Sequence, residues 1–96
     1  MPSLKWTPNA LHCVRELYDF LTEKDQAAAR LAISAIRKKV ALLAVNPNIG
    51  RPAADLEPEH RELLVPFGAT GYVVLYHTTS DLILVLAVRH QKEVGY

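Results

Sequence analysis

Residues 72–90 read YVVLYHTTSDLILVLAVRH, and this stretch decides the fold. Two runs rich in β-branched and aromatic residues, YVVLYH and LILVLAVRH, flank the short polar segment TTSD. This pattern predicts two strands joined by a tight turn. A third extended run, RELLVPF, precedes them across the turn GATG, so we expect an antiparallel meander of three strands. Pro66 lacks a ladder donor, which places its strand at a sheet edge or turns that position outward.

Two amphipathic helices are predicted ahead of the meander. Thr7 and Pro8 form a helix-start signal, because a hydroxyl caps the first amides and proline tolerates the first helical position. Asp25 is the expected cap of a second helix that runs from Gln26 to about Val45. The apolar stripes at helical spacing are Leu11, Val14, Leu17, Tyr18 and Leu21 in the first helix, and Ala29, Ala32, Ile33, Ile36, Val40 and Leu43 in the second.

The remaining segments complete the order of elements. SLKW predicts a short strand around 4–6, while NPNIGRPA and ADLEPEH predict irregular chain between the second helix and the meander. The order β-α-α-β-β-β indicates an α+β fold, in which a helix hairpin covers one face of an antiparallel sheet. The expected core includes Leu17, Ile33, Ile36, Val40, Leu63, Val74 and Leu84, with Trp6 also inside.

Composition favours one small cytoplasmic domain over residues 1–96. Half of the 96 residues are hydrophobic, and every apolar run is too short to span a bilayer. Cys13 is the single cysteine, so it cannot form an internal disulfide. His12 and Cys13 lack further ligands at metal spacing, and we expect no metal and no cofactor. A net charge of +1 gives little support for binding nucleic acid, and we expect no sequence-specific binding.

The last strand is apolar on both of its faces. Ile83 and Val85 alternate with Leu82, Leu84 and Leu86, although a helix hairpin covers only one face of a sheet. A contiguous exposed apolar surface marks a partner site. The alternatives are that the helices wrap far enough, or that the tail folds back, to cover the second face.

The whole chain resembles the RelE/ParE superfamily of toxins from type II toxin–antitoxin modules, and is closer to ParE-like members. The resemblance rests on the element order and on NPNIGRP, RELLVPF, GYVVLYH and LILVLAVRHQKE in their order and spacing. It implies a growth-inhibiting toxin, of the kind associated with plasmid stabilisation, that a cognate antitoxin holds inactive. The antitoxin's flexible segment is implied to wrap the toxin and cover apolar grooves.

The superfamily divides into enzymes and binders. RelE-like members cut messenger RNA on the ribosome without a metal, whereas ParE-like members bind and poison DNA gyrase without a catalytic site. The nuclease pattern matches four positions here, Arg61, Arg89, His90 and Tyr96. An arginine can clamp a phosphate and a histidine is suited to proton transfer near neutral pH, so this set is chemically compatible with such a site.

The departures from the nuclease pattern favour the gyrase inhibitor. RelE-like nucleases carry lysines before the first meander strand, but this chain has RPAADLEPEH, which is acidic and lacks lysine. No catalytic residue is therefore assigned, and the ribosome-dependent endonuclease remains the alternative. A second alternative is a non-toxic interaction module or homodimer. The candidates for contact with a target or partner are Arg51, Arg61, Ile83, Val85, Arg89, His90 and Tyr96.

Two of these candidates have structural alternatives. Arg51 follows Gly50 and is suited to holding its own loop by donating to carbonyl oxygens. Arg61 is suited to a cross-strand ion pair, with a carboxylate of the acidic loop as its partner.

Overall fold

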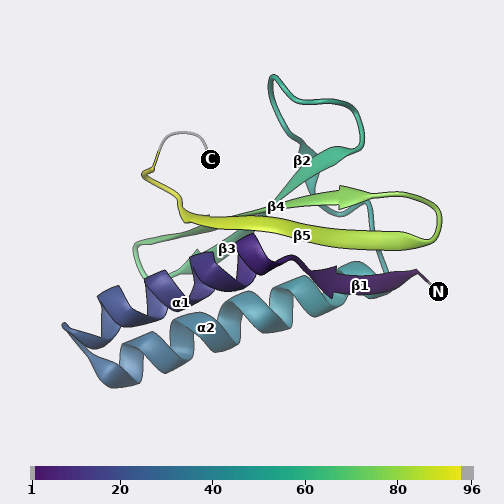
Figure 1. Cartoon of the computed structure of the whole chain (residues 1–96). Coiled ribbons are helices and arrows are strands. Elements are labelled where there is room, and N and C mark those ends of the chain that lie inside the picture. Colours follow the sequence, from purple (N-terminus) through teal and green to yellow (C-terminus); the bar gives the residue numbers. More distant parts are fainter. Residues whose placement is uncertain (1, 94–96) are drawn as a thin grey trace.

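A computed structural model describes residues 2–93 as two helices packed on one face of a five-stranded sheet (Figure 1). The elements are β1 (Ser3–Trp6), α1 (Pro8–Thr22), α2 (Gln26–Ala41), a 3-10 turn η1 (Leu42–Ala44), β2 (Arg51–Pro52), β3 (His60–Phe67), β4 (Thr70–Thr78) and β5 (Leu82–His90). The predicted α+β fold is confirmed. Within residues 2–93, no helix is both long and apolar enough to cross a membrane.

Both helices begin where the sequence places their caps. The Thr7 hydroxyl accepts from the backbone N–H of Ala10 at 3.1 Å, and Pro8 occupies the first helical turn. The Asp25 carboxylate accepts from the N–H groups of Ala27 and Ala28. Figure 1 shows α1 and α2 lying side by side beneath the sheet. The second helix ends at Ala41, earlier than expected, because the chain tightens into η1.

The sheet has the order β1-β5-β4-β3-β2 and is mixed. β3, β4 and β5 form the predicted antiparallel meander. β1 instead lies parallel to β5, with Leu4 opposite Ile83 and Trp6 opposite Val85. The expectation of a purely antiparallel sheet is therefore wrong for β1. The helix hairpin of α1 and α2 returns the chain to the end of the sheet where β1 begins (Figure 1). The three meander strands then alternate in direction, so the last of them, β5, runs parallel to β1.

The short strand β2 is not predicted from the sequence. Arg51 and Pro52 pair with Glu62 and Arg61, although the segment around them is rich in proline and glycine. Two paired residues are too few to produce an alternating pattern in the sequence. β3 is not the edge strand of the sheet, but Pro66 lies beyond its short pairing with β2 and turns its missing N–H outward, which is the second of the two predicted alternatives.

The core lies between the helices and the sheet. Ile36, Val40, Leu63 and Val74 are buried there, as predicted. Leu17, Ile33 and Trp6 are partly buried against the same cluster. Leu84 differs from expectation: it is half-buried on the opposite face, because its neighbours Ile83 and Val85 face the helices.

The face of the sheet opposite the helices is covered in part. Leu75 and Ala87 on this face pack with Ala53, which follows β2, and all three are buried. Figure 1 shows β2 and the loop after it rising on the side of the sheet away from α1 and α2. The residue that follows β2 therefore covers the second face only around Leu75 and Ala87, while Leu82, Leu84 and Leu86 on β5 remain half-buried.

Candidate functional site

Arg61 lies on β3 and holds the segment that links η1 to β2. Its Nη1 donates to the carbonyl oxygen of Gly50 at 2.6 Å and reaches that of Asn48 at 3.4 Å. Tyr76, opposite Arg61 on β4, accepts from the N–H of Gly50 at 3.0 Å and donates to the oxygen of Pro47 at 2.7 Å. Arg61 and Tyr76 thus fix the loop 47–50. The expected ion pair of Arg61 with the acidic loop is replaced by these bonds to carbonyl oxygens.

Burial raises the pKa of the Tyr76 hydroxyl, while the bond from Gly50 and the charge of Arg61 oppose this effect. Tyr76 is fully buried, so it remains a neutral donor and acceptor at physiological pH. Its hydroxyl serves the loop and does not face solvent as an acid would need to.

The Glu62 carboxylate contacts two arginine side chains on the face of the sheet opposite the helices. Its carboxylate lies 3.3 Å from Nε of Arg51 and 3.5 Å from Nη2 of Arg89. Glu62 is buried, and the Arg89 side chain is only 16% exposed. Arg89 also donates to the backbone oxygen of Glu93 at 2.6 Å. Arg51 therefore contacts a carboxylate, and not the carbonyl oxygens considered from the sequence.

His90 faces the helix side of the sheet with Val88, because a register shift of β5 between Val85 and Ala87 reverses the faces of the residues after it. The N–H of Lys92 donates to its Nδ1 at 3.1 Å, so Nδ1 carries no proton in this arrangement. Its Nε2 then carries the proton and lies 3.1 Å from the hydroxyl of Thr70. The ring also packs edge-on against Tyr72, with 5.6 Å between ring centroids. Both ring nitrogens are thus engaged within the chain.

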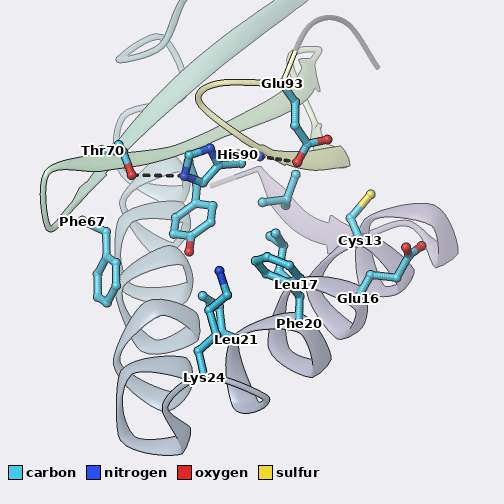
Figure 2. Close-up of a pocket in the computed structure, with 12 residues that line it drawn as sticks. Cys13, Glu16, Leu17, Phe20, Leu21, Lys24, Phe67, Thr70, His90 and Glu93 are labelled. Atoms are coloured by element: carbon cyan, nitrogen blue, oxygen red, sulfur yellow. Dashed lines mark hydrogen bonds between the residues drawn. The ribbon is translucent and has the colours of Figure 1, made fainter.

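A hollow of about 630 Å³ opens beside His90, between α1 and the end of the meander. Figure 2 shows Leu17, Phe20 and Leu21 on one wall, and Phe67 and His90 across from them. Glu16, Lys24 and Glu93 lie at its rim. The hollow is mainly apolar, and it offers one lysine against two carboxylates for a charged ligand.

The predicted nuclease residues are not brought to one site. Arg89 and His90 lie on opposite faces of β5, and Arg61 lies opposite Tyr76 whereas His90 lies opposite Tyr72. Those two β4 positions are about 13 Å apart along the strand. A proton-transfer group must come within about 3 Å of the reacting atoms, with the phosphate-binding groups around them. Tyr96 lies outside the described residues.

Ile83 and Val85 occupy a different place from that expected. Both are fully buried beneath the helices, so they are unavailable to a partner that binds the surface of this structure. Their burial corrects the prediction that they contact a partner. Within the part of the chain from 2 to 93, no group of three His, Cys, Asp or Glu side chains is placed to hold a metal.

Comparison with known proteins gives the family. The model of the ParE toxin of the type II toxin–antitoxin system parDE matches residues 4–95. The chain belongs to the ParE toxin family. This ParE-family protein is 32% identical over 93 residues to Toxin RelE3 of Caulobacter vibrioides, covering 97% of this chain and 98% of the relative. It is thus a toxin of a type II toxin–antitoxin module, within the RelE/ParE superfamily, and its module implies a cognate antitoxin.

Solved structures share the fold of this ParE-family toxin. The chromosomal ParDE toxin–antitoxin system from P. aeruginosa matches with a TM-score of 0.77 and 25% identity, covering 94% of this chain and 96% of that chain. YafQ from E. coli strain BL21(DE3) matches at 0.62 and 13% identity, covering 95% and 94%. HP0894 from Helicobacter pylori, a conserved hypothetical protein, matches at 0.60 and 18% identity, covering 99% and 100%. The last two matches concern the fold alone.

Tyr76 and Glu62 hold the candidate residues of this ParE-family toxin in place, and the sequence alone does not identify either of them. The sequence shows Tyr76 only as part of an apolar strand, yet its hydroxyl anchors the loop 47–50. Glu62 stands out in the sequence only as a neighbour of Arg61, yet it draws Arg51 and Arg89 together. A charged residue within a buried strand is unusual, and this is the signal that could have found Glu62.

Proposed function

We propose that this toxin inhibits growth by binding DNA gyrase, without a catalytic centre of its own, and that its cognate antitoxin neutralises it. The observation that carries the proposal is the separation of Arg61, Arg89 and His90 over both faces of the sheet. Each of the three side chains already supports the fold, since Arg61 holds a loop, Arg89 contacts Glu62, and His90 closes the turn after β5. The match to the ParE family supports the same assignment.

Electrostatics also supports a binder over a nuclease. An RNase that works without a metal stabilises phosphate charge with a basic surface. Here the loop between β2 and β3 carries Asp55, Glu57 and Glu59, and the whole chain has a net charge of +1. These carboxylates repel the RNA backbone at long range. A surface that binds a protein has no such requirement for positive charge.

The proposal predicts that His90→Gln retains growth arrest when the toxin is expressed without antitoxin. The amide of glutamine can still donate and accept hydrogen bonds at the turn, but it cannot serve as a general base or acid. If the protein were a nuclease that depends on His90, this change would be expected to slow RNA cleavage by a factor of about 10²–10⁴. The measurement is the growth of cells after induction, combined with mapping of messenger RNA 5′ ends.

His12→Gln is the matched control, since it makes the same change at a histidine whose side chain is exposed on α1. Growth arrest by both variants at equal protein levels supports the gyrase proposal. Loss of arrest and of codon-positioned cuts in His90→Gln alone would contradict it and would favour the ribosome-dependent endonuclease.

A further inference from the structure

The charges of this toxin are unevenly distributed along the chain. Residues 26–54 hold five of the eleven lysines and arginines and none of the ten aspartates and glutamates. The rest of the chain therefore has six cations against ten carboxylates, so the net charge of +1 conceals a basic part and an acidic part. Four of the five cations in the basic part, Arg30, Arg37, Lys38 and Lys39, belong to α2. This helix is thus the most basic element of the fold.

The fold does not use the cations of α2. Arg30, Arg37 and Lys38 are exposed, and Lys39 is half-buried. Within residues 2–93, none of these four side chains forms an ion pair or a hydrogen bond. A concentration of one charge on a surface attracts a partner of the opposite charge. The cations of α2 are therefore available to a partner that carries carboxylates or phosphates.

Large apolar side chains are exposed beside these cations. Leu31 is 64% exposed, Leu42 at the start of η1 is 47% exposed, and Val45 just after η1 is 70% exposed. Lys38 and Leu42 follow Leu31 by seven and eleven residues, which puts the three side chains on one face of the helix. The opposite face holds Ile36 against the sheet. The charged and large apolar members of this outer face of α2 are Arg30, Leu31, Arg37, Lys38, Leu42 and Val45.

Other positions that could contact a target are already engaged within the chain. Arg61 donates to the carbonyl oxygen of Gly50, and Arg89 lies against Glu62. Both ring nitrogens of His90 have partners. The outer face of α2 differs from these positions, because it offers cations and apolar side chains that the fold leaves unused.

The combination of apolar and basic side chains indicates the kind of partner. Duplex DNA would satisfy the cations but would set Leu31, Leu42 and Val45 against phosphates, which offer no apolar contact. A second copy that packed the same face across a two-fold axis would bring these cations near their own counterparts, which repel. A protein surface that carries both apolar side chains and carboxylates satisfies the two parts together.

We propose that the toxin contacts its target through the outer face of α2, which binds an acidic and partly apolar surface of DNA gyrase. Leu31 and Leu42 are buried in this contact, while Arg30, Arg37 and Lys38 pair with carboxylates around them. Buried apolar contacts supply most of the affinity, and the surrounding charges raise the association rate and the selectivity. The inference rests on the proposed function, because it assigns this surface to the gyrase target.

Lys38→Glu tests the inference by reversing one charge on the outer face of α2. The toxin concentration that halves supercoiling by gyrase is expected to rise about tenfold or more. Lys24→Glu is the matched control, because Lys24 is also exposed but lies over the ring of Phe20 beside the hollow near His90. Inhibition by Lys24→Glu is expected to equal that of the wild-type toxin. Circular dichroism and thermal unfolding establish that both variants are folded.

Leu31→Ala tests the apolar part of the same contact. Truncation of an apolar side chain that binding buries is expected to weaken inhibition about fivefold or more. Leu56→Ala is the control, since Leu56 is an exposed leucine of the loop between β2 and β3. A further measurement needs no variant: acetylation of Lys38 in the wild-type toxin, followed by mass spectrometry, is expected to fall when gyrase is added, while acetylation of Lys24 is unchanged.

Full inhibition by Lys38→Glu and Leu31→Ala, or unchanged acetylation of Lys38, would overturn the inference and leave the gyrase assignment intact. Binding of the wild-type toxin to plain duplex DNA that Lys38→Glu abolishes would also overturn it, since the occupant would then be a phosphate backbone. Full inhibition combined with loss of antitoxin binding in Lys38→Glu would assign the face to the antitoxin instead. Failure of the wild-type toxin to inhibit gyrase would contradict the proposed function itself.

Discussion

Replacing Ile36 with alanine is expected to lower the free energy of unfolding by about 2–5 kcal/mol. Ile36 is fully buried between α2 and the sheet, within the cluster that contains Val74 and Tyr76. Its truncation removes apolar surface from the core and leaves a cavity, because the helix cannot collapse fully onto the sheet. Urea unfolding followed by circular dichroism measures the loss, with the slope of the transition compared between variants.

Leu31→Ala is the matched control on the same helix. Leucine and isoleucine have the same number of carbon atoms, but Leu31 is 64% exposed. A surface substitution of this kind is expected to change stability by about 0.5 kcal/mol or less. Equal losses in the two variants would show that α2 does not pack on the sheet in the way described.

Gly50→Ala is expected to destabilise the protein by about 3 kcal/mol or more. A Cβ at residue 50 would lie 2.6 Å from Oη of Tyr76 and 2.8 Å from the backbone oxygen of Glu62. The loop must therefore move away from β3 and β4, and it then loses its bonds to Tyr76 and Arg61. Thermal unfolding measures the effect, and the amide exchange of residues 47–51 locates it.

Gly68→Ala provides the comparison, because a Cβ at that glycine meets no atom within 4 Å. Gly68 has a φ of +60°, so alanine there costs about 1–2 kcal/mol of backbone strain. Gly50→Ala therefore reports the steric clash of a Cβ with Tyr76 and Glu62, whereas Gly68→Ala reports backbone strain alone. A smaller loss for Gly50→Ala than for Gly68→Ala would contradict the tight anchoring of the loop.

Local signals in the sequence predict most of the elements. The caps at Thr7 and Asp25, the apolar stripe of the second helix and the two strands in 72–90 each depend on a few residues, and each is confirmed. Leu11 in the stripe of the first helix is 50% exposed, which differs from the prediction. The direction of β1 is not predicted, because strand pairing depends on where the two helices return the chain. The pairing of β2 is also missed, since its two residues are fixed by Glu62 and Arg61 on a distant strand.

The candidate site is harder to predict than the fold. The alternation of β5 shows that Arg89 and His90 face opposite sides, yet it does not show which face the helices cover. The sequence therefore assigns Ile83 and Val85 to a partner although they lie in the core, and it assigns Leu84 to the core. The carbonyl partners of Arg61 come from a loop whose path depends on Tyr76, and no pattern in the sequence records this contact.

The most direct test of the gyrase proposal compares two assays on the same purified toxin. In the first, DNA gyrase supercoils a relaxed plasmid in the presence of increasing toxin. In the second, ribosomes programmed with messenger RNA are incubated with equal amounts of toxin, and the RNA ends are mapped. The proposal predicts that supercoiling falls or cleaved DNA accumulates while the messenger RNA stays intact. Unaffected gyrase together with codon-positioned cuts, abolished by His90→Ala or Arg61→Ala, would contradict it.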